Sequence, residues 1–86
     1  MPSAKSHRAQ SRRAARNAPL RTRAKTTVAR ARAAIAVGDL ETAENQMLSA
    51  VVALDKAAKK GAIHRANAGR RKSRIMKQMA EARASA

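Results

Sequence analysis

Apolar residues recur every three or four positions along most of the chain, which is the spacing of one face of an α-helix. The first such stripe consists of Leu20, Ala24, Val28, Ala31 and Ile35. Residues that favour β-strands are few, whereas Ala, Arg and Lys, which favour helices, are abundant. The pattern therefore predicts an all-α protein.

A second stripe lies between residues 40 and 58 and is the most apolar of the chain. Its members are Leu40, Ala43, Met47, Ala50, Val51, Leu54 and Ala58. Leu48 and Val52 widen this stripe, so we expect the second helix to be the most buried.

A third helix is predicted from about residue 63 to the mid-eighties. Its expected core residues are Ile63, Ala68, Ile75, Met79 and Ala82, with Met76 at their edge. Gly69 lies inside this helix, where glycine costs about 1 kcal/mol relative to alanine. It could let a backbone or a phosphate approach closely, or it could be a tolerated surface residue, and the sequence favours neither.

Two glycines mark the predicted helix ends. Gly38 and Gly61 each follow an apolar stripe, and glycine accepts the left-handed backbone that commonly ends a helix. Asp39 is then expected to cap the second helix. Because both connections are short, neighbouring helices should be antiparallel. The sequence predicts a three-helix bundle with a long basic N-terminal helix.

The first sixteen residues are basic and have almost no large apolar side chains. We expect residues 1–16 to be an extension that frays when free and becomes helical on its partner, and residues 17–86 to form the bundle. Two alternatives remain open at the boundary. Either Asn17 caps a helix that has Pro19 in its first turn, or one long helix is kinked at Pro19.

Charge divides the chain into three blocks. The net charge is +15, and residues 1–38 contain no acid. Residues 39–55 contain acids and no base, and from Lys56 onward the chain is basic again, with Glu81 the exception. This arrangement indicates a folded unit that binds a polyanion and turns one side away from it.

The densest cationic stretch is residues 56–74. Its helical part carries Arg65, Arg70, Arg71, Lys72 and Arg74 and no acid. Residues four apart on a helix share a face, so Arg70 and Arg74 should lie together. The stripe is too dense to be neutralised within the chain, which points to an external polyanion.

No enzymatic constellation is present in the sequence, and we expect no catalytic residue, cofactor or metal. The chain has no cysteine, no Gly-rich phosphate loop and no nucleophile signature. His7 and His64 lack ligand-spaced partners, which favours a solvated or capping role over metal binding. No apolar run is long enough to span a bilayer and no secretory signal is apparent, so we expect a cytosolic protein. Because no catalytic constellation is present, we also expect no small-molecule substrate.

The type of polyanion follows less directly. The absence of aromatic residues argues against platforms that stack single-stranded bases. Arginine-rich helices that recognise backbone and shape remain, and folded RNA suits them. A nucleoid-type architectural DNA-binding protein is the alternative. A membrane-surface helix is a third hypothesis, weakened because aromatic anchors are missing.

An ordered set of motifs along the chain carries a family resemblance, and this resemblance decides between RNA and DNA. The motifs are Gly38-Asp39, Leu54-Asp55-Lys56-Ala57-Ala58, Lys60-Gly61, Ile63-His64, and Arg70 with Lys72-Ser73-Arg74, preceded by Lys5-Ser6, Arg16-Asn17 and Lys25-Thr26. Over nearly its whole length the chain resembles the bacterial small-subunit ribosomal protein S20 family. The resemblance implies a structural constituent of the cytoplasmic small ribosomal subunit. Such a protein binds 16S ribosomal RNA directly at the 5′ domain and the long penultimate helix near the 3′ end. It supports RNA folding and assembly beside other subunit components.

The predicted RNA contacts come from two sources. The resemblance implies Lys5, Ser6, Arg16, Asn17, Lys25, Thr26, His64, Arg70, Lys72, Ser73 and Arg74. The charge pattern adds Arg8, Arg12, Arg13, Arg21, Arg23, Lys60, Arg65 and Arg71. The chain departs from the family pattern at two positions. Ala66 stands where the family usually has Asn, with Asn67 one place on, and Gly69 stands where alanine is usual.

Overall fold

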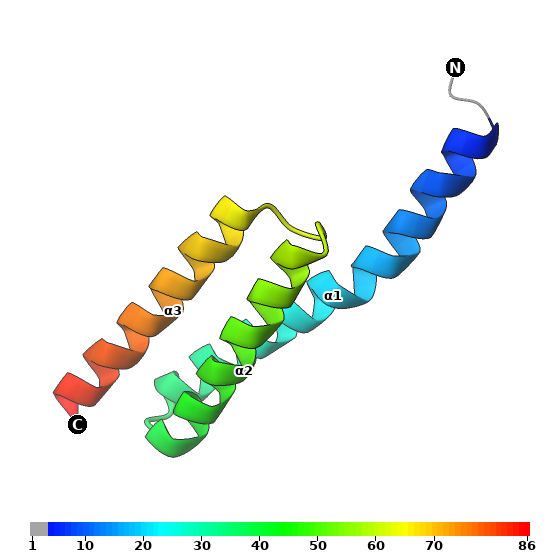
Figure 1. The fold of residues 1–86 in the computed structure, drawn as a ribbon. Coiled ribbons are helices and arrows are strands. Elements are labelled where there is room, and N and C mark those ends of the chain that lie inside the picture. Colours follow the sequence, from blue (N-terminus) through cyan, green and yellow to red (C-terminus); the bar gives the residue numbers. More distant parts are fainter. Residues whose placement is uncertain (1–3) are drawn as a thin grey trace.

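The computed structural model describes residues 4–86, with side chains from residue 8 onward. Over these residues it consists of three α-helices (Figure 1). α1 spans Ala4–Ala36, α2 spans Leu40–Lys59 and α3 spans Arg65–Ser85. α2 packs antiparallel to the C-terminal half of α1, and α3 returns antiparallel to α2. The prediction of an all-α three-helix bundle is confirmed.

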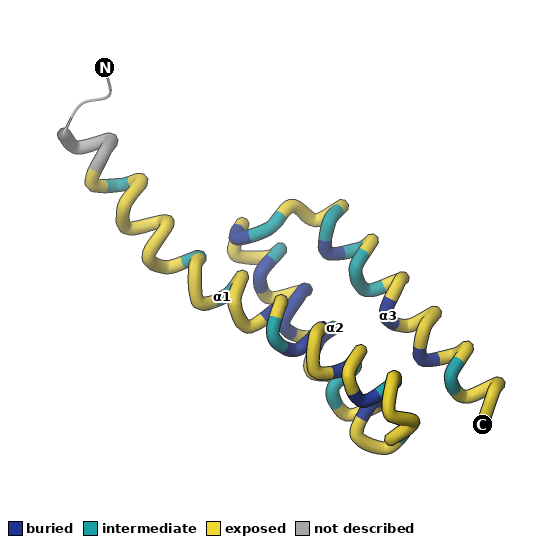
Figure 2. The backbone as a smooth tube through the Cα atoms, turned by 180° about the vertical axis from the view of Figure 1, so that it is seen from behind, coloured by how far each residue is buried: buried dark blue, intermediate teal, exposed yellow. Residues whose placement is uncertain are grey.

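α1 is one continuous helix of 33 residues with Pro19 inside it. The alternative in which Asn17 begins a separate helix is therefore wrong. The N-terminal half of α1 extends beyond the other two helices, and its described side chains are mostly exposed (Figure 2). This projection makes the molecule elongated, with extents of 57 × 19 × 17 Å.

Both helix-ending glycines have the predicted left-handed backbone, with φ of 77° at Gly38 and 76° at Gly61. After α1, the Gly38 N–H donates to the Ile35 carbonyl at 3.1 Å and the Asp39 N–H donates to the Ala34 carbonyl at 3.1 Å. This pair of bonds is the Schellman arrangement, which satisfies carbonyls that a helix end leaves free. The same pair recurs at the end of α2, where Gly61 and Ala62 donate to Ala58 and Ala57.

The N-terminus of α2 is capped as predicted. Asp39 Oδ1 accepts a hydrogen bond from the Thr42 backbone N–H at 3.2 Å. Hydrogen bonds from the Thr42 side chain and backbone hold the pKa of Asp39 below its ordinary value, because they favour the ionised carboxylate. The carboxylate is also well placed beside the positive end of the helix dipole.

The core is thin because alanine supplies most of it. Its largest fully buried side chains are Leu54, Ile75 and Met79, all predicted core residues. One buried cluster includes Leu54 and Val28. A second cluster consists of Met79 with Ala34 and Ala43, which lie on either side of the connection between α1 and α2. Small side chains let the helix backbones approach closely, but they bury little apolar area.

Two predictions about the second stripe are wrong. Leu48 is 55% exposed and Val52 is 66% exposed, because they lie at the rim of the contact between α1 and α2, beside Leu20, and not inside it. Ala53 and Ala57 are buried in their place. In α1, Leu20 and Ile35 are only half-buried.

Thr27 is a buried polar residue that the stripe did not predict. Its hydroxyl donates back to the Arg23 carbonyl at 2.8 Å, with the Ala24 carbonyl 3.1 Å away. This local bond lets a polar side chain occupy a core position without an unsatisfied donor.

Candidate nucleic-acid interface

The predicted contacts on α1 follow the helix from its projecting half into the bundle. The exposed contacts begin along the projection with Arg8, Arg12, Arg13 and Arg16. They continue farther along α1 with Arg21, Arg23 and Lys25, which are also exposed. Asn17 and Thr26 are half-buried. Lys5 and Ser6 lie outside the residues whose side chains the structure describes. Arg21 also reaches the connection before α3, where one guanidinium nitrogen lies 3.5 Å from the Ala62 carbonyl oxygen.

His64 is the N-cap of α3. Its Nδ1 accepts a hydrogen bond from the Ala66 N–H at 3.1 Å, and the side chain is exposed. Since Nδ1 is the acceptor, the ring hydrogen of the neutral imidazole belongs on Nε2. The capping role suggested from the sequence is thus present, and Nε2 is left as a donor for another group.

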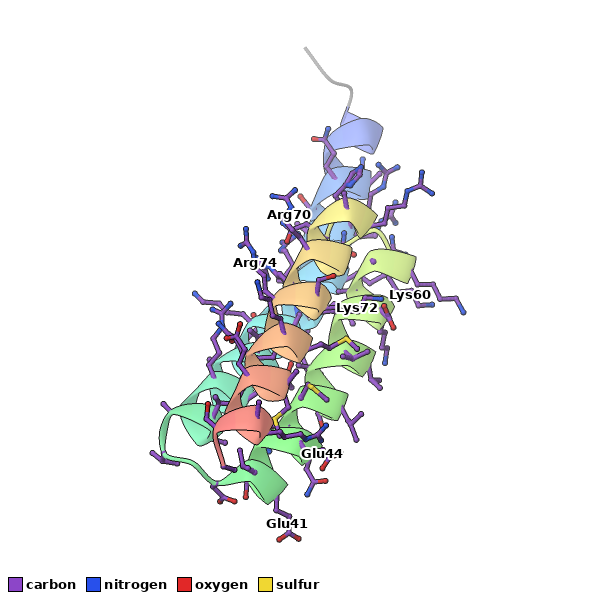
Figure 3. All side chains as sticks on the ribbon, turned by 90° about the vertical axis from the view of Figure 1, so that its left-hand side faces the viewer. Glu41, Glu44, Lys60, Arg70, Lys72 and Arg74 are labelled. Atoms are coloured by element: carbon purple, nitrogen blue, oxygen red, sulfur yellow. The ribbon has the colours of Figure 1, made fainter. Side chains whose placement is uncertain are left out.

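α3 presents Arg70 and Arg74 together, as their spacing predicted. Figure 3 shows both at one edge of the bundle, whereas Lys60 projects from the opposite edge. Arg65 and Ser73 are exposed and Arg71 is half-buried. We call Arg70, Arg71 and Arg74 the α3 stripe.

Lys72 differs from its neighbours because it is paired within the chain. Its Nζ lies 2.7 Å from Asp55 Oδ1 on α2, and Arg83 makes a similar pair at 2.7 Å with Glu44. The acidic block therefore helps to hold α3 against α2. An ammonium has three donors, so Lys72 can still bind a phosphate while it contacts Asp55.

Three cations that were not predicted as contacts lie where α1 meets α2, Arg30 on α1 and the other two on α2. Arg30, Lys56 and Lys59 line a groove with the predicted residues Arg16 and Arg23. Lys56 and Lys59 lie in the last turn of α2, where cations interact favourably with the negative end of the helix dipole, so their charge by itself does not indicate a binding site. The sequence alone could not find them, because their grouping depends on how α1 and α2 pair.

The family model for ribosomal protein S20 matches residues 2–80. The chain belongs to the ribosomal protein S20 family. Among similar proteins is the small ribosomal subunit protein bS20 of Thermomicrobium roseum, 47% identical over 75 residues, which are 87% of this chain and 76% of the relative.

Two further members of the S20 family show similar agreement. The bS20 protein of Heliobacterium modesticaldum is 46% identical over 67 residues, covering 78% of this chain and 76% of the relative. The bS20 protein of Nitratidesulfovibrio vulgaris is 44% identical over 73 residues, covering 85% of this chain and 84% of the relative. The predicted family is confirmed, and the nucleoid alternative gains no support.

Within the described residues, His and carboxylate side chains do not gather in groups of three or more that could hold a metal ion. None of the described helices combines the length and apolar character needed to cross a membrane.

Proposed function

We propose that this protein is a structural constituent of the small ribosomal subunit that binds 16S ribosomal RNA directly. Membership of the S20 family carries this proposal, because the relatives are small-subunit proteins. The chemistry agrees, since exposed arginines and lysines neutralise phosphates and release counterions. The protein acts by position and charge, in the cytoplasmic subunit, and performs no catalysis.

The finer proposal concerns where it binds. We place the RNA contacts in the 5′ domain and the long penultimate helix, beside other subunit components. Residues 1–16 become fixed on RNA, while residues 17–86 form the supporting bundle. The proposed contact residues are those predicted from the sequence, and the exposure of Arg16, Arg70 and Arg74 supports them. Nuclease protection of 16S RNA tests the location, because protection of neither region would contradict it.

A salt series tests direct RNA binding. Filter binding at rising salt compares 16S RNA with duplex DNA of equal length. The logarithm of the affinity for RNA should fall linearly with the logarithm of salt concentration, by about 0.7 to 0.9 per phosphate contacted. Equal affinity for RNA and DNA at every salt concentration would contradict the ribosomal function.

A matched pair of variants tests the α3 stripe. Arg74→Gln and Arg83→Gln each remove one charge from α3, but Arg74 is exposed at the stripe whereas Arg83 is paired with Glu44. Arg74→Gln should weaken RNA binding and reduce the salt slope by about one contact, or 0.7 to 0.9. Arg83→Gln should leave the slope unchanged. Equal changes in both variants would mean that net charge, not the stripe, governs binding.

A further inference from the structure

A groove follows the seam between α1 and α2. Three adjoining hollows form it, and Lys56 lines all three. We call this the seam groove and define it by six cations: Arg16, Arg23, Arg30, Lys56, Lys59 and Lys60. No lining residue of the three hollows is acidic. A groove on the other side of α1, in contrast, includes Glu81.

The acids of α2 do not neutralise the seam groove. Glu44 and Asp55 pair with Arg83 and Lys72 on α3, away from α1. Among the ion pairs of the described residues, none involves a seam-groove cation. Two of the three acids of α2 are thus paired with α3, the third, Glu41, does not line the seam groove, and the seam with α1 is left positive.

Apolar side chains lie between these cations. Leu48 and Val52, the two residues wrongly predicted to be core, border the groove beside Leu20. Exposed apolar groups surrounded by one sign of charge suit a ligand that is itself both anionic and apolar. A nucleic-acid strand fits this description, because phosphates alternate with sugars and bases.

The length of the cationic row also favours a long ligand. Arg16 and Arg30 are 14 residues apart on α1, which at 1.5 Å per residue is about 21 Å. The row continues along the projecting half of α1 through Arg12, which is four residues before Arg16 and on nearly the same face. A single phosphate or a short acidic group would occupy only a fraction of it.

We propose that the seam groove binds the phosphodiester backbone of one RNA strand, as a surface separate from the α3 stripe. The inference rests on the proposed function and adds Arg30, Lys56 and Lys59 to the contacts. Lys60 and the pair Arg70–Arg74 project from opposite edges of the bundle (Figure 3).

Matched double variants provide the first test. Lys56→Gln with Lys59→Gln removes two groove charges, and Lys77→Gln with Arg83→Gln removes two charges elsewhere. The groove variant should bind 16S RNA at least tenfold more weakly and lose about 1.4 to 1.8 of the salt slope, from two contacts. The control should keep the wild-type slope. Lys56→Arg with Lys59→Arg should restore binding.

A tethered probe provides the second test. The chain contains no cysteine, so Val52→Cys supplies a single attachment site for an iron chelate that cleaves nearby RNA. Gln78→Cys supplies the matched site on α3, because Gln78 is exposed and lies four residues after Arg74 on the same face. Cleavage of two different RNA segments is expected. A bound complex without cleavage from residue 52 would overturn the seam-groove proposal.

The outcomes separate this inference from the proposed function. Failure of the wild-type protein to bind 16S RNA contradicts the function itself. Normal wild-type binding, together with an unaffected Lys56→Gln, Lys59→Gln variant, contradicts only the groove. A competition experiment uses a polyglutamate peptide and an RNA oligonucleotide of equal charge at equal concentration. If the peptide displaces the RNA from the wild-type protein but not from the groove variant, the groove prefers an acidic polypeptide. That result would overturn the assignment of the groove to RNA.

Discussion

His64 shows how one side chain can serve both structure and binding. Nδ1 closes the first turn of α3 by accepting from the Ala66 N–H, while the exposed ring leaves Nε2 for an outside acceptor. The cap needs only one nitrogen, so binding of a phosphate oxygen by the other would not disturb the helix start. A capping role and an RNA contact at His64 are therefore compatible.

Gly69 raises the opposite question, because the protein itself does not require glycine there. A Cβ at this position would meet nothing within 4 Å. We predict that Gly69→Ala stabilises the free protein by about 1 kcal/mol, since alanine is the better helix former. Urea denaturation measures this change.

Gly61→Ala is the control, because its left-handed backbone should make the same substitution destabilising. A loss of stability in Gly69→Ala would contradict the open surroundings seen at this site. If Gly69→Ala gains stability but weakens RNA binding, a phosphate approaches the helix at this glycine.

Among the helices, α1 is unusual because half of it has no protein partner. Proline lacks the N–H that would bond to the carbonyl four residues earlier, so Pro19, which lies beside the last turn of α2, weakens α1 close to where it leaves the bundle. N-terminal to Pro19, packing against α2 and α3 cannot offset the lost hydrogen bond, because this half of α1 extends beyond both helices. The projecting half therefore depends on its own propensity or on RNA.

We predict that Pro19→Ala makes the projecting half more helical in the free protein. Proline costs about 3 kcal/mol relative to alanine in a helix interior, and its removal restores the missing bond. Amide hydrogen exchange over residues 8–18 should slow, while exchange in α3 serves as the unchanged reference. Equal exchange in both proteins would show that Pro19 does not limit the order of this segment.

α2 occupies the central position among the helices. It packs on α1 and α3, pairs Glu44 and Asp55 with α3 and contributes lysines to the seam with α1. Surface ion pairs such as Lys72–Asp55 contribute only about 0.2 to 1 kcal/mol each. They orient α3 more than they stabilise it, and the buried residues must supply most of the cohesion.

For the whole molecule, a thin core must withstand the repulsion of a net charge of +15. Leu54 is fully buried at the centre of this core. We predict that Leu54→Ala destabilises the free protein by about 2 to 5 kcal/mol, which could abolish folding without RNA. Thermal unfolding followed by circular dichroism measures the loss.

Leu48→Ala is the matched control, because Leu48 is exposed and its truncation should change stability by less than about 0.5 kcal/mol. Equal losses in the two variants would contradict the assignment of Leu54 to the core. Excess RNA should restore part of the stability of Leu54→Ala, since a ligand that binds the folded state favours it.

The sequence by itself determined the features that depend on neighbours along the chain. The helical period, the stops at Gly38 and Gly61, the cap at Asp39 and the alignment of Arg70 with Arg74 were all predictable, because each is a local interaction. The ordered motifs also sufficed to predict the family.

Only the tertiary structure decided how each helix is rotated toward its neighbours. The apolar stripe of α2 is wider than the area that α1 and α3 cover, so Ala53 and Ala57 are buried while Leu48 and Val52 remain exposed. The same rotation brings Lys72 to Asp55 and gathers Lys56 with Arg23 in the seam groove. Periodicity specifies which residues share a face, but packing between helices selects the face that is covered.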